Sequence, residues 1–363
     1  MRINIYTTSY FVTDQRVQRV ANTLSANGFT VRVYCRKHNV FTPEIVGYRV
    51  NYIKTMFKKG PFFYFLYNTK IFFQILFSDT DIIYANDLDT LPGCAMGSIF
   101  RNKKLIYDSH ELFTEVPELI NRPLIKLIWR FQESIFIKRA KAVITVSEGV
   151  ANELKKQYGI KKVEVIRNLP EHNSIVVFRD KQPVLIYQGA LNVGRGIELA
   201  IEMMKYLPHF KLLIIGKGDI EIKLRKQMLE SNLMDRVQFL GQLTPTKLRL
   251  ITPTAWLGLS LEEDMGLNYR YALPNKLFDY ISAHVPVLVS DLPEMKKIVE
   301  EFEIGIVAKS RNPVDLANQV ASLINDKTRY ENILEKVKIA SERLNWQNEA
   351  HKLINLVNEV ITN

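Results

Sequence analysis

The sequence has few of the features that mark secreted or metal-stabilised proteins. Its 363 residues include only two cysteines, Cys35 and Cys94, and their separation does not match a metal-binding motif. This argues against both a disulfide framework and a structural zinc site. The N-terminus alternates like a strand directly after Met1, without the basic and continuously apolar regions of a signal peptide. Together these absences predict a cytoplasmic protein.

Long uninterrupted hydrophobic runs are also scarce. The most apolar segment, Met56 to Phe77, is crowded with aromatic residues and flanked by lysines, but Asn68, Lys70 and Gln74 interrupt it. This argues against a transmembrane helix. Two interpretations stay open: a basic and aromatic helix at a membrane interface, or core helices that cover the following strand.

Acidic residues are under-represented in the first half of the chain alone. Residues 1–170 contain 25 Lys and Arg against 14 Asp and Glu, whereas residues 171–363 contain 24 of each kind. A basic half beside a neutral one predicts an anionic partner for the first half, such as a membrane surface, a phosphorylated lipid or nucleic acid. The alternative is a solvated basic surface that serves solubility.

What is present is a repeated α/β pattern. Strand-length apolar segments such as RINIYTTS, TVRVYCR and KLIYDSH alternate with stretches of helical period, and the pattern restarts at PVLIYQGA. This alternation predicts two α/β domains with mostly parallel sheets, 1–170 and 171–345, followed by a C-terminal helix over 346–363. The boundary is expected near 169–180, and without a low-complexity linker the domains are expected to face each other across a cleft.

Two glycine-containing loops follow predicted strands of the second domain. Gly189, Gly194 and Gly196, with Arg195 between them, precede a helix expected to begin near Ile197. Backbone N–H groups at such a helix start, together with the arginine, suit a diphosphate. A tight turn that needs glycine only for its geometry explains the same residues equally well.

The second loop contains Gly216 and Gly218. In a dinucleotide-binding fingerprint a third glycine would follow at position 221, where this chain has Glu221, so the loop gives little support to a nicotinamide site. The remaining alternatives are a loop that lies against a base or ribose, and a plain turn.

Several segments together resemble glycosyltransferase family 4. QGALNVGRGIELAI, IIGKGD, LGLSLEED, ALPNKLFDYISAHVPVLVSDLPE, YANDLDTLPG and LIYDSHELFTEVPEL occur in the order found in that family and span nearly the whole chain. The resemblance implies the GT-B fold, with two Rossmann-like domains, each on a doubly wound parallel sheet, and a C-terminal helix that packs back toward the first domain. It implies a retaining transferase that uses a nucleotide-diphosphate sugar of the UDP or GDP type.

The resemblance also implies a set of donor-binding residues. Family members usually carry an arginine and a lysine that hold the donor diphosphate. Here the first basic position is Ala190, so a charge is missing that Lys276 is expected to supply. The implied donor-binding residues are Gly189, Arg195, Gly216, Gly218, Lys276, Leu277 and Asp279.

The acidic motif of the family departs from its usual form in this chain. Asp279 matches the second acid of the family's paired acidic motif, which hydrogen-bonds ribose. The first acid is replaced by Tyr271, and Glu262, Glu263 and Asp264 lie farther upstream. Which of these acids takes its place is left open.

In the first domain, the resemblance implies that His110 contacts the donor sugar, with Glu111 beside it. The expected role is charge stabilisation during a front-face displacement, in which the donor phosphate accepts the acceptor proton. Asp14 and Arg16, expected in the loop after the first strand, and Asp87 are predicted on the acceptor side.

No catalytic metal is predicted. Asp79 with Asp81, and Asp87 with Asp89, resemble the metal-binding D-x-D of another glycosyltransferase fold, but the first pair precedes its strand and faces away from the expected cleft. A GT-B enzyme can stabilise its leaving diphosphate with cations and helix amides.

These features predict a retaining hexosyltransferase that acts on a glycan or lipid-linked acceptor in polysaccharide or lipopolysaccharide biosynthesis. The alternatives are a nucleotide-sugar epimerase and a non-catalytic nucleotide-sugar-binding protein with the same fold. Nucleic acid is not expected as a partner. Peripheral contact with the inner face of an anionic cytoplasmic membrane is expected through the first domain, with Lys54, Lys58 and Lys59 among the contacts.

Overall fold

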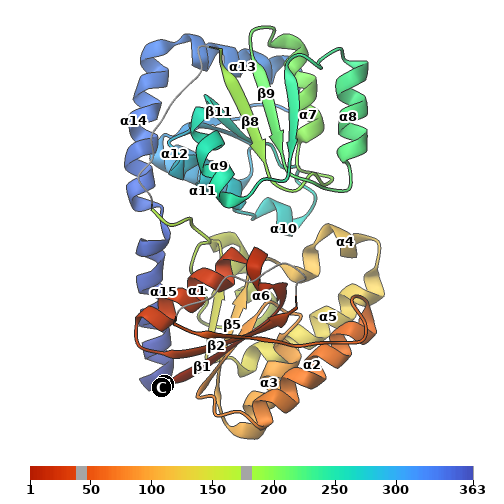
Figure 1. The fold of residues 1–363 in the computed structure, drawn as a ribbon, viewed down its shortest axis with the longest axis vertical. Helices are drawn as coiled ribbons and strands as arrows, with labels where there is room; N and C mark the ends of the chain where they lie inside the picture. Colours follow the sequence, from red (N-terminus) through yellow and green to blue (C-terminus); the bar gives the residue numbers. More distant parts are fainter. Residues whose placement is uncertain (38–46, 173–181, 363) are drawn as a thin grey trace. The chain divides into compact units, whose positions relative to one another are not determined.

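The computed structural model describes residues 1–37, 47–172 and 182–362 and divides into two compact units. Unit 1 comprises Met1–Asn168 and Glu349–Asn363, and unit 2 comprises Leu169–Asn348. Each unit is built on a parallel sheet, which confirms the predicted α/β class with two domains (Figure 1). Most of the segment predicted as the boundary, from residue 173 onward, lies outside the described residues.

In unit 1 the described residues form a seven-stranded parallel sheet with the order β3-β2-β1-β4-β5-β6-β7. The sheet is buried at its centre because helices cover both faces, and all five residues of β4 are buried. This explains why the central strands read as nearly continuous apolar runs. The strands are β1 (Arg2–Tyr10), β2 (Thr30–Arg36), β3 (Arg49–Tyr52), β4 (Ile82–Asn86), β5 (Lys104–Ser109), β6 (Ala142–Thr145) and β7 (Glu164–Val165).

The helices of unit 1 are α1 (Gln15–Ala26), α2 (Pro61–Leu76), α3 (Leu91–Arg101), α4 (Pro117–Ile120), α5 (Pro123–Phe136), α6 (Glu148–Tyr158) and α15 (Trp346–Thr362). α2, α3 and α5 lie together on one side of the sheet, and α3 packs against both of the others (Figure 1). The C-terminal part of α15 belongs to unit 1, where the Lys104 ammonium donates to the Ile361 carbonyl at 2.7 Å.

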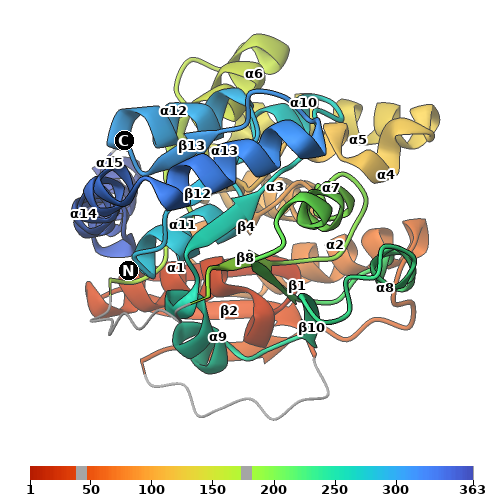
Figure 2. The same ribbon diagram turned by 90° about the horizontal axis from the view of Figure 1, so that it is seen from above.

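Unit 2 contains a six-stranded parallel sheet with the order β10-β9-β8-β11-β12-β13 among its described residues. Its strands are β8 (Val184–Gln188), β9 (Lys211–Ile215), β10 (Val237–Gly241), β11 (Leu257–Ser260), β12 (Val287–Val289) and β13 (Gly305–Val307). Its helices are α7 (Ile197–Met203), α8 (Glu221–Glu230), α9 (Pro245–Ile251), α10 (Leu267–Arg270), α11 (Asn275–Ser282), α12 (Pro293–Phe302), α13 (Pro313–Asn325) and α14 (Lys327–Arg343). α7 packs between α8 and α13, and α11 packs against α14 (Figures 1 and 2).

In both units the parallel strands end at the same edge, so the loops after β1, β4 and β5 lie near one another, as do those after β8, β9 and β10. Ligands of open α/β sheets bind outside these carboxyl ends. Most residues singled out in the sequence lie in these loops.

Candidate functional site

Unit 2 has a pocket of about 320 Å³ at the carboxyl ends of three adjacent strands. Its walls come from the loop after β8, the loop after β9, the residues after β10 and one side chain of α9. Both polar groups and apolar side chains contribute, as in pockets that hold one small molecule. The lining residues are Gln188, Gly189, Ala190, Ile215, Gly216, Lys217, Gln242, Leu243 and Leu248.

Beside this pocket lies a cluster of charged side chains around Glu262. The Lys276 ammonium is 2.6 Å from Glu262 Oε1, and the Arg195 guanidinium is 4.0 Å from the same oxygen. Lys276 also lies over the Tyr187 ring, 4.1 Å from its centre. Its Cε is 3.8 Å from the point where a Cβ on Gly189 would lie, so the cluster adjoins the pocket. The structure therefore brings the two predicted donor-binding cations together.

The cluster is not a pair of free cations. Lys276 is 7% exposed and Glu262 is fully buried, whereas Arg195 remains 31% exposed. Burial opposes a charge on Glu262, but Lys276 and the Ser260 hydroxyl outweigh it and hold the pKa of Glu262 below its usual value. The carboxylate is thus ionised at neutral pH and neutralises Lys276, which leaves Arg195 as the exposed excess charge.

Glu262 is one of the three acids that the sequence leaves as candidates for the first acid of the family's paired motif. The other two are engaged elsewhere: Glu263 lies 3.5 Å from Arg311, and Asp264 lies 2.6 Å from Arg270. The acidic run in the sequence indicated that one of these residues belongs to the site. Only the structure identifies Glu262, because it alone of the three is buried.

Asp279 lies in α11 and is half-buried, with its carboxylate accepting a hydrogen bond of 3.0 Å from Gln188 Nε2. Gln188 lines the pocket and in turn accepts from the Thr252 hydroxyl. Gln188 was not singled out in the sequence. The arrangement fixes the Asp279 carboxylate next to the pocket, where a polyol such as ribose has an acceptor for its hydroxyl groups.

The prediction for Leu277 needs correction. Its side chain is fully buried in the core of unit 2, and its backbone N–H donates to the Pro274 carbonyl at 3.0 Å. Because side chain and N–H are both engaged, Leu277 is a core residue rather than a donor contact.

The glycine loops are closely packed against each other. A Cβ on Gly216 would lie 1.8 Å from the Gly189 carbonyl oxygen, and one on Gly218 would lie 2.3 Å from that of Leu191. The glycines are therefore required where the two loops meet, and Gly216 also lines the pocket. α7 begins at Ile197, as predicted, with Gly196 at its N-cap.

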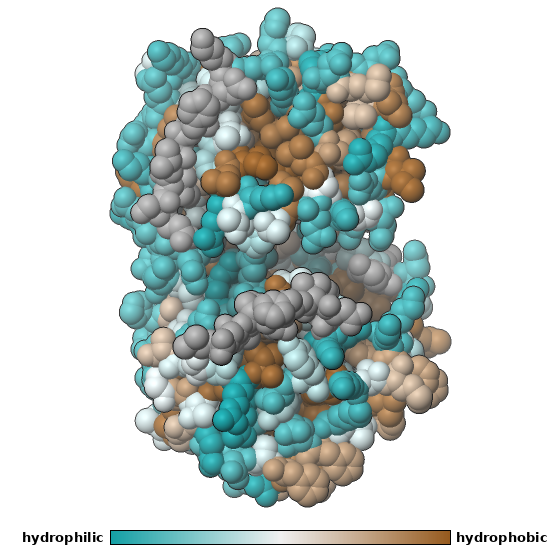
Figure 3. Space-filling model, in the orientation of Figure 1, coloured by the Kyte–Doolittle hydropathy of each residue, from teal (hydrophilic) through white to brown (hydrophobic). Residues whose placement is uncertain are grey.

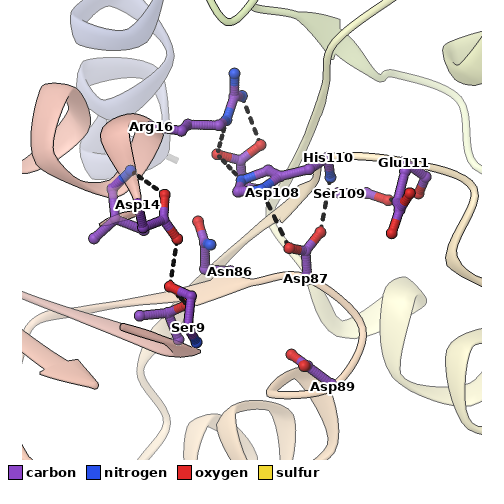
Figure 4. Close-up of polar contacts among 12 residues, drawn as sticks. Ser9, Asp14, Arg16, Asn86, Asp87, Asp89, Asp108, Ser109, His110 and Glu111 are labelled. Carbon is purple, nitrogen blue, oxygen red and sulfur yellow. Dashed lines mark hydrogen bonds and ion pairs between the residues drawn. The ribbon is translucent and has the colours of Figure 1, made fainter. Parts of the chain in front are cut away.

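In unit 1, His110 follows β5 and is held by two aspartates. Its Nδ1 lies 3.2 Å from Asp87, its Nε2 lies 3.5 Å from Asp108, and its backbone N–H donates to Asp87 at 2.9 Å. Figure 4 shows this linked arrangement, with Glu111 apart from it. Burial alone would lower the pKa of His110, but Asp87 and Asp108 together raise it to about 10. The imidazole is therefore protonated at neutral pH and cannot act as a general base.

Asp108, which lay within a quoted motif but was not singled out, is central to this arrangement. It is fully buried and accepts two hydrogen bonds from Arg16, at 2.9 and 2.7 Å, and one from the Tyr84 hydroxyl at 2.7 Å. Burial would raise the pKa of Asp108, but Arg16 and His110 hold it well below its usual range.

Arg16 and Asp14, both predicted on the acceptor side, have different surroundings in the structure. Arg16 lies in the first turn of α1 rather than in a loop, is 3% exposed, and uses its guanidinium on Asp108 and the Ile166 carbonyl. This burial does not fit the predicted contact with an acceptor. Asp14 caps α1 by accepting from the Val17 N–H and also accepts from the Ser9 hydroxyl (Figure 4).

Three further polar side chains lie near the carboxyl end of β4. Asp87 has a left-handed backbone with φ of 65°, which is uncommon for a residue with a side chain. Burial and the neighbouring Asp87 raise the pKa of Asp89 to about 7. Neither amide atom of the buried Asn86 has a hydrogen-bond partner among the described residues. Buried polar groups without a partner mark a place where water or a ligand hydroxyl can bind.

The other acid pair is placed as the sequence indicated. Asp79 and Asp81 precede β4, and both interact with Arg2. Within the described residues, His, Cys, Asp and Glu side chains form no group of three or more that could hold a metal ion.

The Met56 to Phe77 segment contains α2, a helix that packs on α3 and buries Phe63, Tyr67, Ile71 and Ile75, while other aromatic side chains stay exposed. Within the described residues, no helix has both the length and the apolar character that a membrane crossing requires.

The fold places the chain in a known structural class. It matches a sucrose-phosphate synthase from Thermosynechococcus elongatus with a TM-score of 0.83 and 17% identity, covering 100% of this chain and 99% of the other. It matches Anabaena HepE, solved with UDP and glucose, with a TM-score of 0.77 and 17% identity over 99% of each chain. The chain has the GT-B glycosyltransferase fold.

The sequence comparisons agree with this class. Residues 14–169 match the model described as Glycosyltransferase Family 4, and residues 169–339 match that described as Glycosyl transferases group 1. Together the two models cover residues 14–339, and both describe glycosyltransferases.

Two curated relatives are mannosyltransferases. One is the O-antigen chain mannosyltransferase RfbU of Salmonella typhimurium, 24% identical over 221 residues, or 55% of this chain and 60% of the relative. The other is the chitobiosyldiphosphodolichol beta-mannosyltransferase of Candida albicans, 24% identical over 282 residues, or 66% of this chain and 57% of the relative. The matches thus span less than two thirds of either relative.

Proposed function

We propose that the chain is a retaining glycosyltransferase that transfers a hexose from a nucleotide-diphosphate sugar to a glycan or lipid-linked acceptor in polysaccharide biosynthesis. The observation that carries this proposal is the cluster of Arg195, Lys276 and Glu262 beside the pocket of unit 2. A base and ribose fill the pocket, with Asp279 accepting from ribose hydroxyls, and Arg195 binds the diphosphate. The matches to the two glycosyltransferase models and the two mannosyltransferase relatives support this assignment.

The proposed chemistry is a front-face displacement. The bond from the sugar anomeric carbon to the donor phosphate breaks, the acceptor oxygen bonds to that carbon on the same face, and the phosphate oxygen takes the acceptor proton. The protonated state of His110 supports this route because an imidazolium can stabilise negative charge but cannot remove a proton. On the acceptor side we propose Asp14 and Asp87, with Asn86 and Asp89 as further acceptors or donors for hydroxyl groups.

A panel of nucleotide sugars, with mannose donors included because of the relatives, tests the activity. Slow donor hydrolysis or transfer with retained anomeric configuration supports the proposal. A changed sugar still attached to its nucleotide indicates an epimerase, binding without turnover indicates a binding protein, and an inverted product contradicts retention.

The donor site is tested by binding of nucleoside diphosphates to Arg195→Ala. Loss of a charged hydrogen bond is expected to weaken binding by about 1.5–3 kcal/mol. Lys276 cannot be removed alone without leaving Glu262 buried and unpaired, so the double variant Lys276→Met/Glu262→Gln replaces the pair by neutral groups of similar size. Lys205→Ala, which removes a surface ion pair with Glu202 on unit 2, is the matched control and should bind normally. Unchanged affinity for UDP and GDP in folded Arg195→Ala and in the folded double variant would refute the assignment.

A further inference from the structure

Unit 1 carries an extended apolar surface on the outer side of α2, α3 and α5. We name it the apolar face and define it by large apolar side chains that are exposed to solvent. Its members are Met56, Phe57, Phe62, Phe65, Phe73, Phe77, Ile99, Phe100, Leu124, Ile125, Leu127, Ile128, Phe131 and Ile135. Figure 3 shows tan and brown side chains along the lower right of unit 1, where Figure 1 draws α2 and α5.

The apolar face is continuous across the three helices. Phe72 of α2 packs edge-on against Phe100 at the end of α3, with ring centres 5.4 Å apart. Tyr64 of α2 packs edge-on against Trp129 of α5 at 5.1 Å. These ring contacts join the rows on α2 and α5 into one surface, and a surface of this kind on a protein marks an interaction site.

α5 has its polarity reversed relative to an ordinary surface helix. Its inward side presents Glu133, which is buried and accepts hydrogen bonds from the Tyr107 and Tyr158 hydroxyls at 2.8 and 2.6 Å. Its outward side presents Leu124, Leu127 and Phe131, which are 75%, 63% and 64% exposed. An ordinary surface helix turns its apolar stripe to the core. Apolar side chains turned outward, with cations beside them, are typical of a helix that lies in a membrane interface.

The charge around the apolar face is predominantly positive, although Lys126 of α5 is paired with Glu115 at 2.8 Å. Residues 54–77, 99–104 and 122–139 together contain twelve Lys and Arg and a single acid, the buried Glu133. A second copy of the same surface would bring cations against cations, which opposes self-association. The apolar face needs a partner with an apolar interior and a negatively charged surface. An anionic bilayer has both.

We propose that the apolar face docks on an anionic phospholipid bilayer, with side chains of α2 and α5 in the boundary between headgroups and acyl chains. Lys58, Lys59 and Arg130 would then face the lipid phosphates. The sequence suggested Met56 to Phe77 alone; the structure adds α5 and reveals that the two helices form one surface. The purpose of docking rests on the proposed function, since it brings the enzyme to a lipid-linked acceptor.

Vesicle flotation without donor or acceptor tests the proposal. The full chain should float with vesicles of phosphatidylcholine and phosphatidylglycerol and much less with phosphatidylcholine alone. Leu127→Ser/Phe131→Ser should lower the partition coefficient by about tenfold or more, because two inserted side chains are lost. Ile222→Ser/Leu250→Ser removes two comparably exposed apolar side chains of unit 2, 86% and 73% exposed, and should float like the unchanged protein. Thermal unfolding of each variant checks that it is folded.

Three results would overturn the inference. These are flotation of the α5 variant equal to that of the unchanged chain, absence of flotation with either vesicle, and a dimer in light scattering that the α5 variant converts to monomer while flotation is unchanged. The last result would assign the apolar face to self-association. Turnover of the nucleotide sugar, by donor hydrolysis or transfer, is measured separately and without vesicles. Flotation without any turnover leaves the docking surface standing and refutes the proposed activity, whereas turnover without flotation does the reverse.

Discussion

Asp108 is the residue on which the polar interior of unit 1 depends. One fully buried carboxylate accepts hydrogen bonds from Arg16 of α1 and Tyr84 of β4, and it lies 3.5 Å from the His110 imidazole after β5. It therefore joins three elements that are far apart in the sequence and, together with Asp87, raises the pKa of His110. A buried ion pair adds little net stability, but removing one partner is costly because the other charge stays buried.

Replacing Asp108 by Asn should destabilise the protein by about 3–5 kcal/mol, because the Arg16 guanidinium would stay buried without its counter-charge. Chemical denaturation measures this. The matched control is Asp79→Asn, whose partner Arg2 is 45% exposed and whose own side chain is 75% exposed, so a change of at most about 1 kcal/mol is expected. Equal stability of the two variants would contradict a structural role for Asp108.

Asp108→Asn should also lower the pKa of His110, because one of its two neighbouring carboxylates is lost. The pKa of His110 in the folded protein, about 10, lies above that of an imidazole in the unfolded chain. Protonation of His110 therefore stabilises the folded protein fully below the unfolded-state pKa, and this stability is lost as the pH rises through the folded-state pKa. The variant should therefore show a smaller fall in stability between neutral and alkaline pH than the unchanged protein.

At the scale of elements, the loops after β8 and β9 decide the shape of the pocket in unit 2. Gly216 and Gly189 come so close that no side chain fits between them, and both line the pocket. Gly241, at the end of neighbouring β10, also has a left-handed backbone with φ of 67°, but a Cβ there would have no atom within 4 Å. Alanine substitutions at Gly216 and Gly241 therefore distinguish the effect of close packing from the effect of a left-handed backbone alone.

Gly216→Ala should force the loops apart and abolish measurable nucleotide binding, because the new Cβ would lie 1.8 Å from a carbonyl oxygen. Gly241→Ala should cost about 1–2 kcal/mol of stability from its left-handed backbone and leave nucleotide affinity unchanged. Calorimetric titration with UDP and GDP, alongside thermal unfolding, measures both. Normal affinity in Gly216→Ala would show that the pocket tolerates the displaced loop or is not the nucleotide site.

At the scale of the whole molecule, the two units differ in charge. The excess of Lys and Arg lies in residues 1–170, whereas the residues proposed to bind the donor lie in the neutral part. Arg195 and backbone N–H groups are proposed to stabilise the leaving diphosphate in place of a divalent ion.

Transfer activity should accordingly survive exhaustive chelation. The measurement is the initial rate with a nucleotide sugar before and after EDTA and after readdition of Mg²⁺ or Mn²⁺. A rate that falls with EDTA and returns with either ion would bring Asp87 and Asp89 back as candidate metal ligands.

Local patterns in the sequence predicted much of the fold. The strand predicted at TVRVYCR has the same bounds as β2, and the helix predicted to begin near Ile197 is α7, because alternation and helical period are properties of neighbouring residues. The edge strands β3, β7 and β13 were not predicted, since they are short and only partly buried and so lack the apolar run that marks the central strands. Motif order likewise predicted the GT-B class.

Only the tertiary structure decided which charges are paired and which faces are exposed. The sequence predicts that Lys276 is a cation that binds phosphate. In the structure it forms a buried ion pair with Glu262, which lies fourteen positions upstream. The apolar stripe of α5 predicts that one side of the helix avoids water, yet packing turns the buried polar Glu133 inward and the stripe outward. Pairing and burial depend on contacts between distant segments, and a pattern of neighbouring residues contains no information about those contacts.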